Sequence, residues 1–115
     1  MTSSDLNKML VTKLPFLAGK YNDEVSWQEG DDTGSHVIYG DVLTPYLRDC
    51  MTDDKEKEVQ TVFDFLEELL GLEDTYAEEV VWFSVLESLA YLFEEKGHFT
   101  SLLGEKCKRA LNEVR

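Results

Sequence analysis

The chain has 115 residues, of which 43% are hydrophobic and 11% aromatic, and it carries a formal net charge of −13. This length fits one compact domain over residues 1–115, and the apolar content is too high for a disordered chain. The sequence contains no apolar run of membrane-spanning length and no basic segment leading into a hydrophobic one. We therefore expect a cytoplasmic protein without a membrane span or a secretion signal.

The acidic residues are concentrated in the middle of the chain. Between Lys20 and Glu95 lie 21 of the 24 acidic residues but only four of the 11 basic ones. Such a charge distribution repels nucleic acids and anionic membranes, and it attracts basic proteins mainly by raising their association rate. We expect no direct nucleic-acid or membrane partner, and we expect a basic protein partner.

The first third of the chain is predicted to form two helices and a loop. Apolar residues at helical spacing predict a helix over residues 5–14, capped by Ser3 or Ser4 and ended by the proline that follows. Residues 16–27 fit a second, short helix. Residues 28–35 contain two glycines and no apolar residue, which is typical of a loop.

Two further helices are predicted in the middle of the chain. The helix over residues 36–51 contains Pro45, which removes one backbone hydrogen bond, so we expect its first turns to be irregular. Apolar residues between positions 59 and 70 keep the 3.6-residue period of an amphipathic helix. Asp53 or Asp54 is expected to cap this helix, and the glycine after it ends it.

The last part of the chain completes an all-α fold. Asp74 is predicted to cap a helix over residues 75–96, and residues 80–86 are apolar on nearly all sides, which indicates a central helix buried by several neighbours. A last pair of helical turns over residues 100–115 is expected to be broken or bent at Gly104. The sequence thus predicts an all-α single domain of about five helices, arranged as an irregular bundle or as HEAT-like helix pairs.

The sequence lacks the signatures of an enzyme or a metal site. Its two histidines stand alone, and the loop that begins at Asp31 fails as an EF-hand because His36 replaces the glycine and Val42 the bidentate glutamate. Cys50 and Cys107 stand far apart, which indicates two free thiols rather than a disulfide framework. We expect a protein that is not an enzyme and that uses neither a cofactor nor a metal.

Chain topology predicts that two acidic segments meet at one end of the molecule. If the helix over residues 36–51 leads away from the acidic loop before it, the next antiparallel helix returns to that end and brings the turn at Glu73 beside the loop. No lysine or arginine lies between positions 59 and 81, against seven acidic residues, so we expect an unneutralised rim flanked by Trp27 and Trp82. The predicted partner-binding residues are Asp31, Asp32, Glu73, Asp74, Tyr76, Glu78 and Glu79.

Several short motifs resemble those of a known group of proteins. They are Leu14-Pro15 followed by Tyr21, HVIYGDVL at residues 36–43 with Tyr46-Leu47, VFDFL at 62–66 and FSVLESL at 83–89. Together they resemble small acidic all-helical bacterial immunity proteins of polymorphic-toxin and contact-dependent growth inhibition systems. The resemblance implies a cytoplasmic protein that blocks a toxin domain, often a basic nuclease, by binding it. It assigns no toxin-contacting residue, because such families diverge fastest at their binding faces.

Two functions are therefore expected from the sequence. The first is an immunity protein that neutralises a basic toxin domain through its acidic surface. The alternative is a helical scaffold or regulatory protein that acts through an apolar face, by self-association or assembly. Salt separates the two, because an acidic docking face loses association rate as ions screen it and an apolar face does not.

Overall fold

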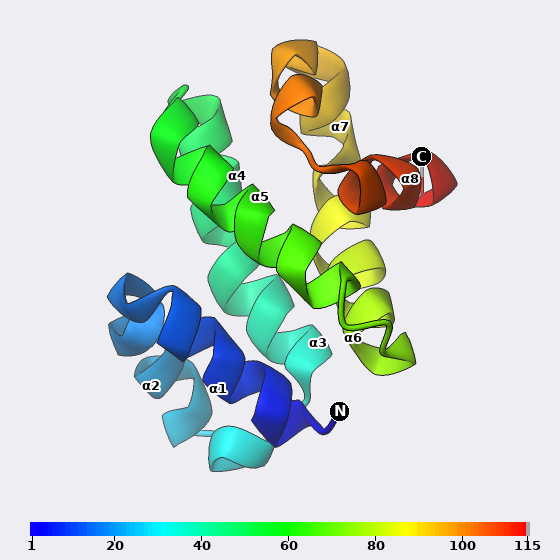
Figure 1. Ribbon diagram of the computed structural model, residues 1–115. Helices are drawn as coiled ribbons and strands as arrows, with labels where there is room; N and C mark the ends of the chain where they lie inside the picture. Colours follow the sequence, from blue (N-terminus) through cyan, green and yellow to red (C-terminus); the bar gives the residue numbers. More distant parts are fainter. Residues whose placement is uncertain (115) are drawn as a thin grey trace.

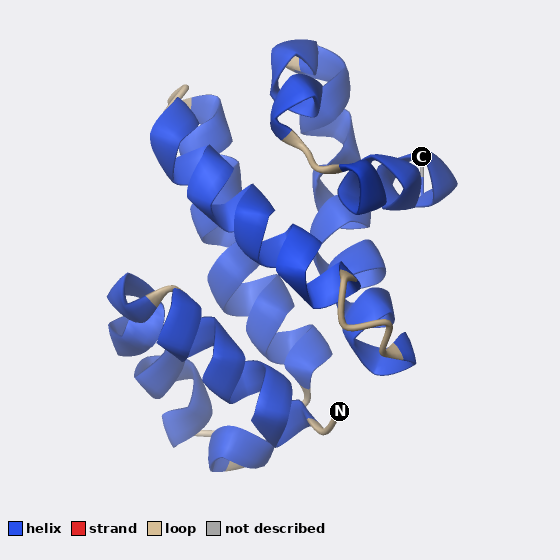
Figure 2. Ribbon diagram, viewed as in Figure 1, coloured by secondary structure: helices blue, strands red, loops and turns tan. Residues whose placement is uncertain are grey.

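A computed structural model describes residues 1–114, and these residues form helices joined by short loops (Figure 2). The chain is 84% helical and no described residue lies in a strand, which confirms the predicted all-α single domain. No helix within residues 1–114 is long and apolar enough to cross a membrane. The α-helices are α1 (Ser3–Lys13), α2 (Ala18–Ser26), α3 (Ser35–Ile38), α4 (Thr44–Thr52), α5 (Glu56–Leu70), α6 (Thr75–Glu79), α7 (Glu87–Glu95) and α8 (Glu105–Val114).

The expected number of about five helices is wrong, because the long predicted helices change their hydrogen-bond pattern midway. The π-helical segment η3 (Tyr39–Leu43) joins α3 to α4, and η4 (Val80–Leu86) joins α6 to α7. The N–H of Thr44 donates to the carbonyl five residues before it, as does that of Glu87. Pro45, which has no N–H, comes two residues after the end of η3, and the expected irregularity in the turns before it is a widened turn and not a break.

Two of the predicted helix starts are wrong. Thr2, and neither Ser3 nor Ser4, caps α1 through a capping box. Lys55 stands at the start of α5 without a side-chain cap. Asp54, predicted as an alternative cap there, has a positive φ of 55° and forms an ion pair with a lysine after α7 instead.

The short connecting segments are mostly 3₁₀ turns. Residues 16–27 are largely helical, as predicted, in η1 (Pro15–Leu17) and α2. The predicted loop holds one turn, η2 (Gly30–Asp32). The expected break in the last pair of helical turns is confirmed, because the 3₁₀ segment η5 (Gly97–Leu102) and an extended Leu103 precede α8. Arg115 lies outside the described residues.

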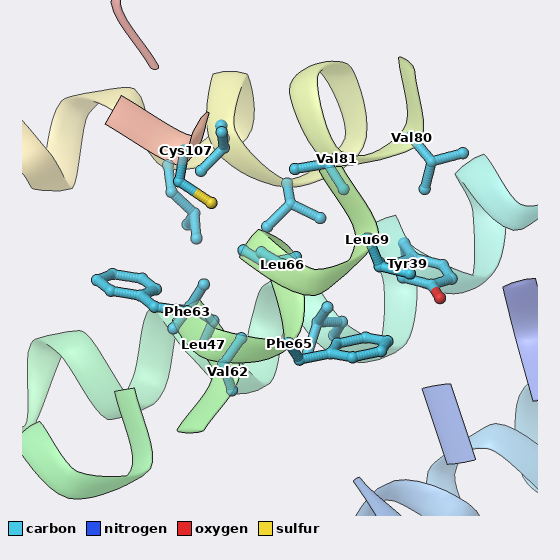
Figure 3. Packing of buried hydrophobic residues seen from close by; sticks show 14 of the residues in the cluster. Tyr39, Leu47, Val62, Phe63, Phe65, Leu66, Leu69, Val80, Val81 and Cys107 are labelled. Carbon is cyan, nitrogen blue, oxygen red and sulfur yellow. The ribbon is translucent and has the colours of Figure 1, made fainter. Parts of the chain in front are cut away.

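The helix formed by α3, η3 and α4 lies between the α1–α2 pair and the remaining helices (Figure 1). The apolar face of α5 is buried, as its period predicts, and Figure 3 shows Leu66 of α5 among side chains of several helices. Phe63 of α5 stacks on Phe93 of α7 with 5.8 Å between ring centroids. The helix over residues 75–95 is less enclosed than expected, because Phe83 in its middle is 51% exposed.

The side chain of Glu67 in α5 caps the start of α8. Its two carboxylate oxygens accept the backbone N–H groups of Lys106, at 3.1 Å, and Cys107, at 2.9 Å. A carboxylate suits this position, because the first N–H groups of a helix have no partner within the helix. Burial, together with the charge of Glu67, raises the pKa of the Cys107 thiol, so that thiol stays protonated.

Candidate functional site

The hydroxyl of Tyr76, in the first turn of α6, joins the two acidic segments of the chain. It accepts the backbone N–H of Ser35 at 3.1 Å and shares a hydrogen bond with the Ser3 hydroxyl at 2.7 Å. These contacts bring the loop before α3, the start of α1 and the start of α6 together at the lower end of the molecule in Figure 1. The predicted convergence is therefore confirmed. We call its carboxylates, Asp31, Asp32, Glu73, Asp74, Glu78 and Glu79, the acidic end.

A buried asparagine, which the sequence analysis did not single out, fixes the acidic loop to α1. The Asn7 side chain is fully buried, and its amide nitrogen donates to the carbonyls of Asp31, at 3.0 Å, and Thr33, at 2.7 Å. Its amide oxygen accepts the Ser35 hydroxyl at 2.8 Å. This loop is therefore held by hydrogen bonds in the protein interior and not only by its own turn.

Asp31 and Asp32 differ in their surroundings. The buried Tyr21 donates its hydroxyl proton to Asp31 Oδ1 across 2.5 Å, whereas Asp32 is exposed and forms no ion pair with a described residue. Burial raises the pKa of Tyr21 well above its usual range, and the hydrogen bond to Asp31 raises it further. Asp31 thus holds the loop in place through the buried Tyr21 of α2.

Asp74 caps α6, as predicted, and forms an ion pair as well. One of its carboxylate oxygens accepts the N–H of Ala77 at 2.9 Å, and the other lies 2.7 Å from the amino-terminal nitrogen of Met1. The hydrogen bond to the amino terminus, followed by that to Ala77, lowers the pKa of Asp74. A partner that used this carboxylate would compete with both contacts.

Two of the three remaining carboxylates of the acidic end line a cavity. Glu73 and Glu78 line a cavity of about 210 Å³ with Trp82, and Lys106 and Arg109 of α8 lie on its other side. The expectation that no base lies near the rim is therefore wrong, although none of the four charged groups approaches another within ion-pair distance in the described part of the chain. Glu79 is exposed on α6, outside this cavity.

The aromatic residues expected beside the rim have separate environments. Tyr76 is half-buried and its hydroxyl is used within the protein. The indole N–H of Trp82 is buried and has no hydrogen-bond partner among residues 1–114. Trp27 follows α2 and is 71% exposed, beside Asp41 of η3. No cluster of three or more potential metal ligands occurs within the described residues.

Comparison with known protein families gave one match. A family model described as a domain of unknown function, DUF7674, matches residues 7–115. Comparison with curated proteins and with solved structures gave no match. The matched region contains Asn7, Tyr76 and all six carboxylates of the acidic end.

Proposed function

The chain belongs to the DUF7674 family of domains of unknown function, and from its surface we propose that it is a binding protein whose acidic end docks a basic protein partner. The observation that carries the proposal is the convergence of two distant acidic segments through Tyr76. Asp32, Glu73 and Glu79 are exposed at this end and form no ion pair with another described residue. Their charge is therefore available to a partner.

The partner we propose is a basic toxin domain, so that the protein acts as an immunity protein in the cytoplasm. A nuclease domain presents cations to the phosphates of its substrate, and a rim of fixed carboxylates can take the place of those phosphates. Steering by opposite charge supports fast capture, which a protein that protects its own cell needs. The net charge of −13 and the resemblance to small acidic immunity proteins support this version.

Three exposed apolar side chains support the alternative of a helical scaffold. Phe83 and Tyr91 are each 51% exposed on the helix over residues 75–95, and Val37 of α3 is exposed as well. Large exposed apolar side chains often mark surfaces that associate with other proteins. If the protein acts as such a scaffold, Phe83→Ser should abolish its self-association or assembly, and high salt should not weaken that association.

The proposal is tested first by asking whether the gene upstream encodes a toxin, and then by binding kinetics with the C-terminal domain of that toxin. The test variant combines Asp32→Asn and Glu79→Gln, which remove charges without internal partners. The matched control combines Glu95→Gln and Glu113→Gln, which remove the same charge from exposed positions on α7 and α8. We expect the test variant to lower the association rate about tenfold at low salt and to flatten its salt dependence. An equal loss in the control would mean that net charge alone acts and that the acidic end is no site.

A further inference from the structure

A second acidic pocket lies between α2 and η3, outside the acidic end. Its volume is about 250 Å³. Trp27, which is 71% exposed, is the most exposed large apolar residue of the described chain, and it forms one wall. The residues that line the pocket are Lys20, Asp23, Glu24, Trp27, Asp41 and Val42.

Two separate elements supply the carboxylates of this pocket. Asp23 and Glu24 lie in the last turns of α2, and Asp41 belongs to η3, which packs against α2. The amide of Gln28 donates to Glu24 at 2.8 Å and so fixes its orientation. The carboxylates of Asp23 and Asp41 make no hydrogen bond or ion pair with any residue that the structure describes.

Lys20 offsets only part of the negative charge of the pocket. It lines the same hollow and forms no ion pair within residues 1–114, so three acidic residues and one basic residue line the pocket. An aromatic wall beside unpaired carboxylates is complementary to an organic cation that is flat enough to stack on an indole. Guanidinium meets this requirement and also pairs with carboxylates through two parallel hydrogen bonds, whereas ammonium is compact and strongly hydrated.

We propose that this pocket receives an arginine side chain of the basic partner, with the guanidinium stacked on Trp27 and paired with Asp23 and Asp41. The proposal rests on the proposed function, because it takes the same partner to contact both sites. The chain itself connects them, since Trp27 ends α2 only four residues before Asp31. One basic surface laid across this part of the molecule meets the pocket and the acidic end together.

Titration of the isolated protein with L-argininamide tests this inference, followed by the two tryptophan indole N–H signals in NMR spectra. We expect a saturable shift of the Trp27 signal and of the Asp41 amide, and no shift of the Trp82 signal. L-citrullinamide, which has nearly the same shape and keeps the α-amino group but lacks the guanidinium charge, should cause no saturable shift. Equal shifts with both compounds, or shifts spread over the whole acidic surface, would overturn the proposal.

Variants distinguish specific binding of argininamide in this pocket from nonspecific electrostatic attraction to the acidic protein. Trp27→Leu should weaken argininamide binding about two- to fivefold, as expected for loss of a cation–π contact at an exposed site. Asp23→Asn combined with Asp41→Asn should weaken it by at least as much. Glu95→Gln combined with Glu113→Gln removes the same charge elsewhere and should leave the affinity unchanged. An equal weakening by this control would show that only net charge acts.

The outcomes also separate this inference from the proposed function. If argininamide binds at Trp27 but Asp32→Asn with Glu79→Gln leaves partner binding intact, the pocket stands and the acidic end fails as the docking site. If the acidic-end variant loses association rate and argininamide does not bind at Trp27, the proposed function stands and the arginine pocket is wrong.

Discussion

The carboxylate of Glu67 occupies the space where a side chain on Gly104 would begin. A Cβ added to Gly104 would lie 2.5 Å from Glu67 Oε1, and from this position the carboxylate accepts the N–H groups of Lys106 and Cys107. The glycine that precedes α8 therefore serves to admit a capping group from another helix.

The first prediction concerns this cap. Glu67→Ala and Gly104→Ala should each lower the free energy of unfolding by about 1–2 kcal/mol, because either change separates the start of α8 from the carboxylate that caps it. Urea denaturation of both single variants and the double variant measures this. The double variant should be less destabilised than the sum of the two, since without Glu67 the added methyl group meets no carboxylate. Glu68→Ala, which removes only an exposed ion pair with Lys13, serves as the control and should cost less than about 0.5 kcal/mol.

The second prediction concerns the pH dependence of the Asp74 ion pair. Asp74→Asn keeps an oxygen for the N–H of Ala77 but removes the charge that faces the Met1 ammonium group. Folding lowers the pKa of Asp74, so its stabilising effect is present above the unfolded pKa of about 4 and is lost as the pH falls through the lower folded pKa. We expect the variant to be less stable than the parent at neutral pH, with a gap that closes on acidification. A gap of constant size in denaturation curves down to about pH 2 would contradict this assignment.

The third prediction concerns Asn7. Asn7→Leu should destabilise the protein by about 2–4 kcal/mol, because it removes the side-chain donor of the buried Thr33 carbonyl and leaves the Ser35 hydroxyl only its longer bond to the Ser3 carbonyl. Hydrogen exchange should also show faster exchange over residues 29–35 than in the parent protein. Asn112→Leu, at an exposed position of α8, is the matched control and should alter neither quantity. Unchanged exchange in the loop would mean that its own turn is sufficient to hold it.

The fourth prediction separates buried from exposed aromatic residues. Phe63→Ala should lower the free energy of unfolding by about 3–5 kcal/mol, because it opens a cavity against Phe93. Phe83→Ala should cost less than about 1 kcal/mol, although this phenylalanine lies in the most apolar segment of the chain. Similar losses in thermal or urea denaturation would place Phe83 in the core, contrary to the structure.

Sequence reasoning located the features that depend on local periodicity. The buried face of α5 follows from its 3.6-residue period, and the cap at Asp74 follows from the residue type before a helix. The missed features depend on tertiary contacts. Asn7 lies next to an apolar stripe and reads as a surface residue, and Glu67 caps a helix that begins almost forty residues later.

The acidic end also combines one feature that could be predicted from the sequence with one that depends on tertiary contacts. Its convergence could be predicted from antiparallel helix order, because neighbouring segments at helix ends meet in space. Its partial neutralisation could not, since Lys106 and Arg109 come from α8 and the ammonium group from the start of the chain. Counting charges along the sequence therefore overestimated how much of the negative charge at the acidic end is unopposed by basic groups.

The two π-helical segments have a consequence for chain length. A turn closed over five residues holds one residue more than an α-helical turn, so deleting one residue from η3 or η4 would let a regular α-helix form. If the same residues instead formed a regular α-helix without a deletion, everything beyond would rotate by about 100°, the angle that one residue contributes to an α-helix. Leu47 of α4 or Phe93 of α7 would then turn away from the core that each now fills. In these two segments, the number of residues determines which side chains of the following helix are buried.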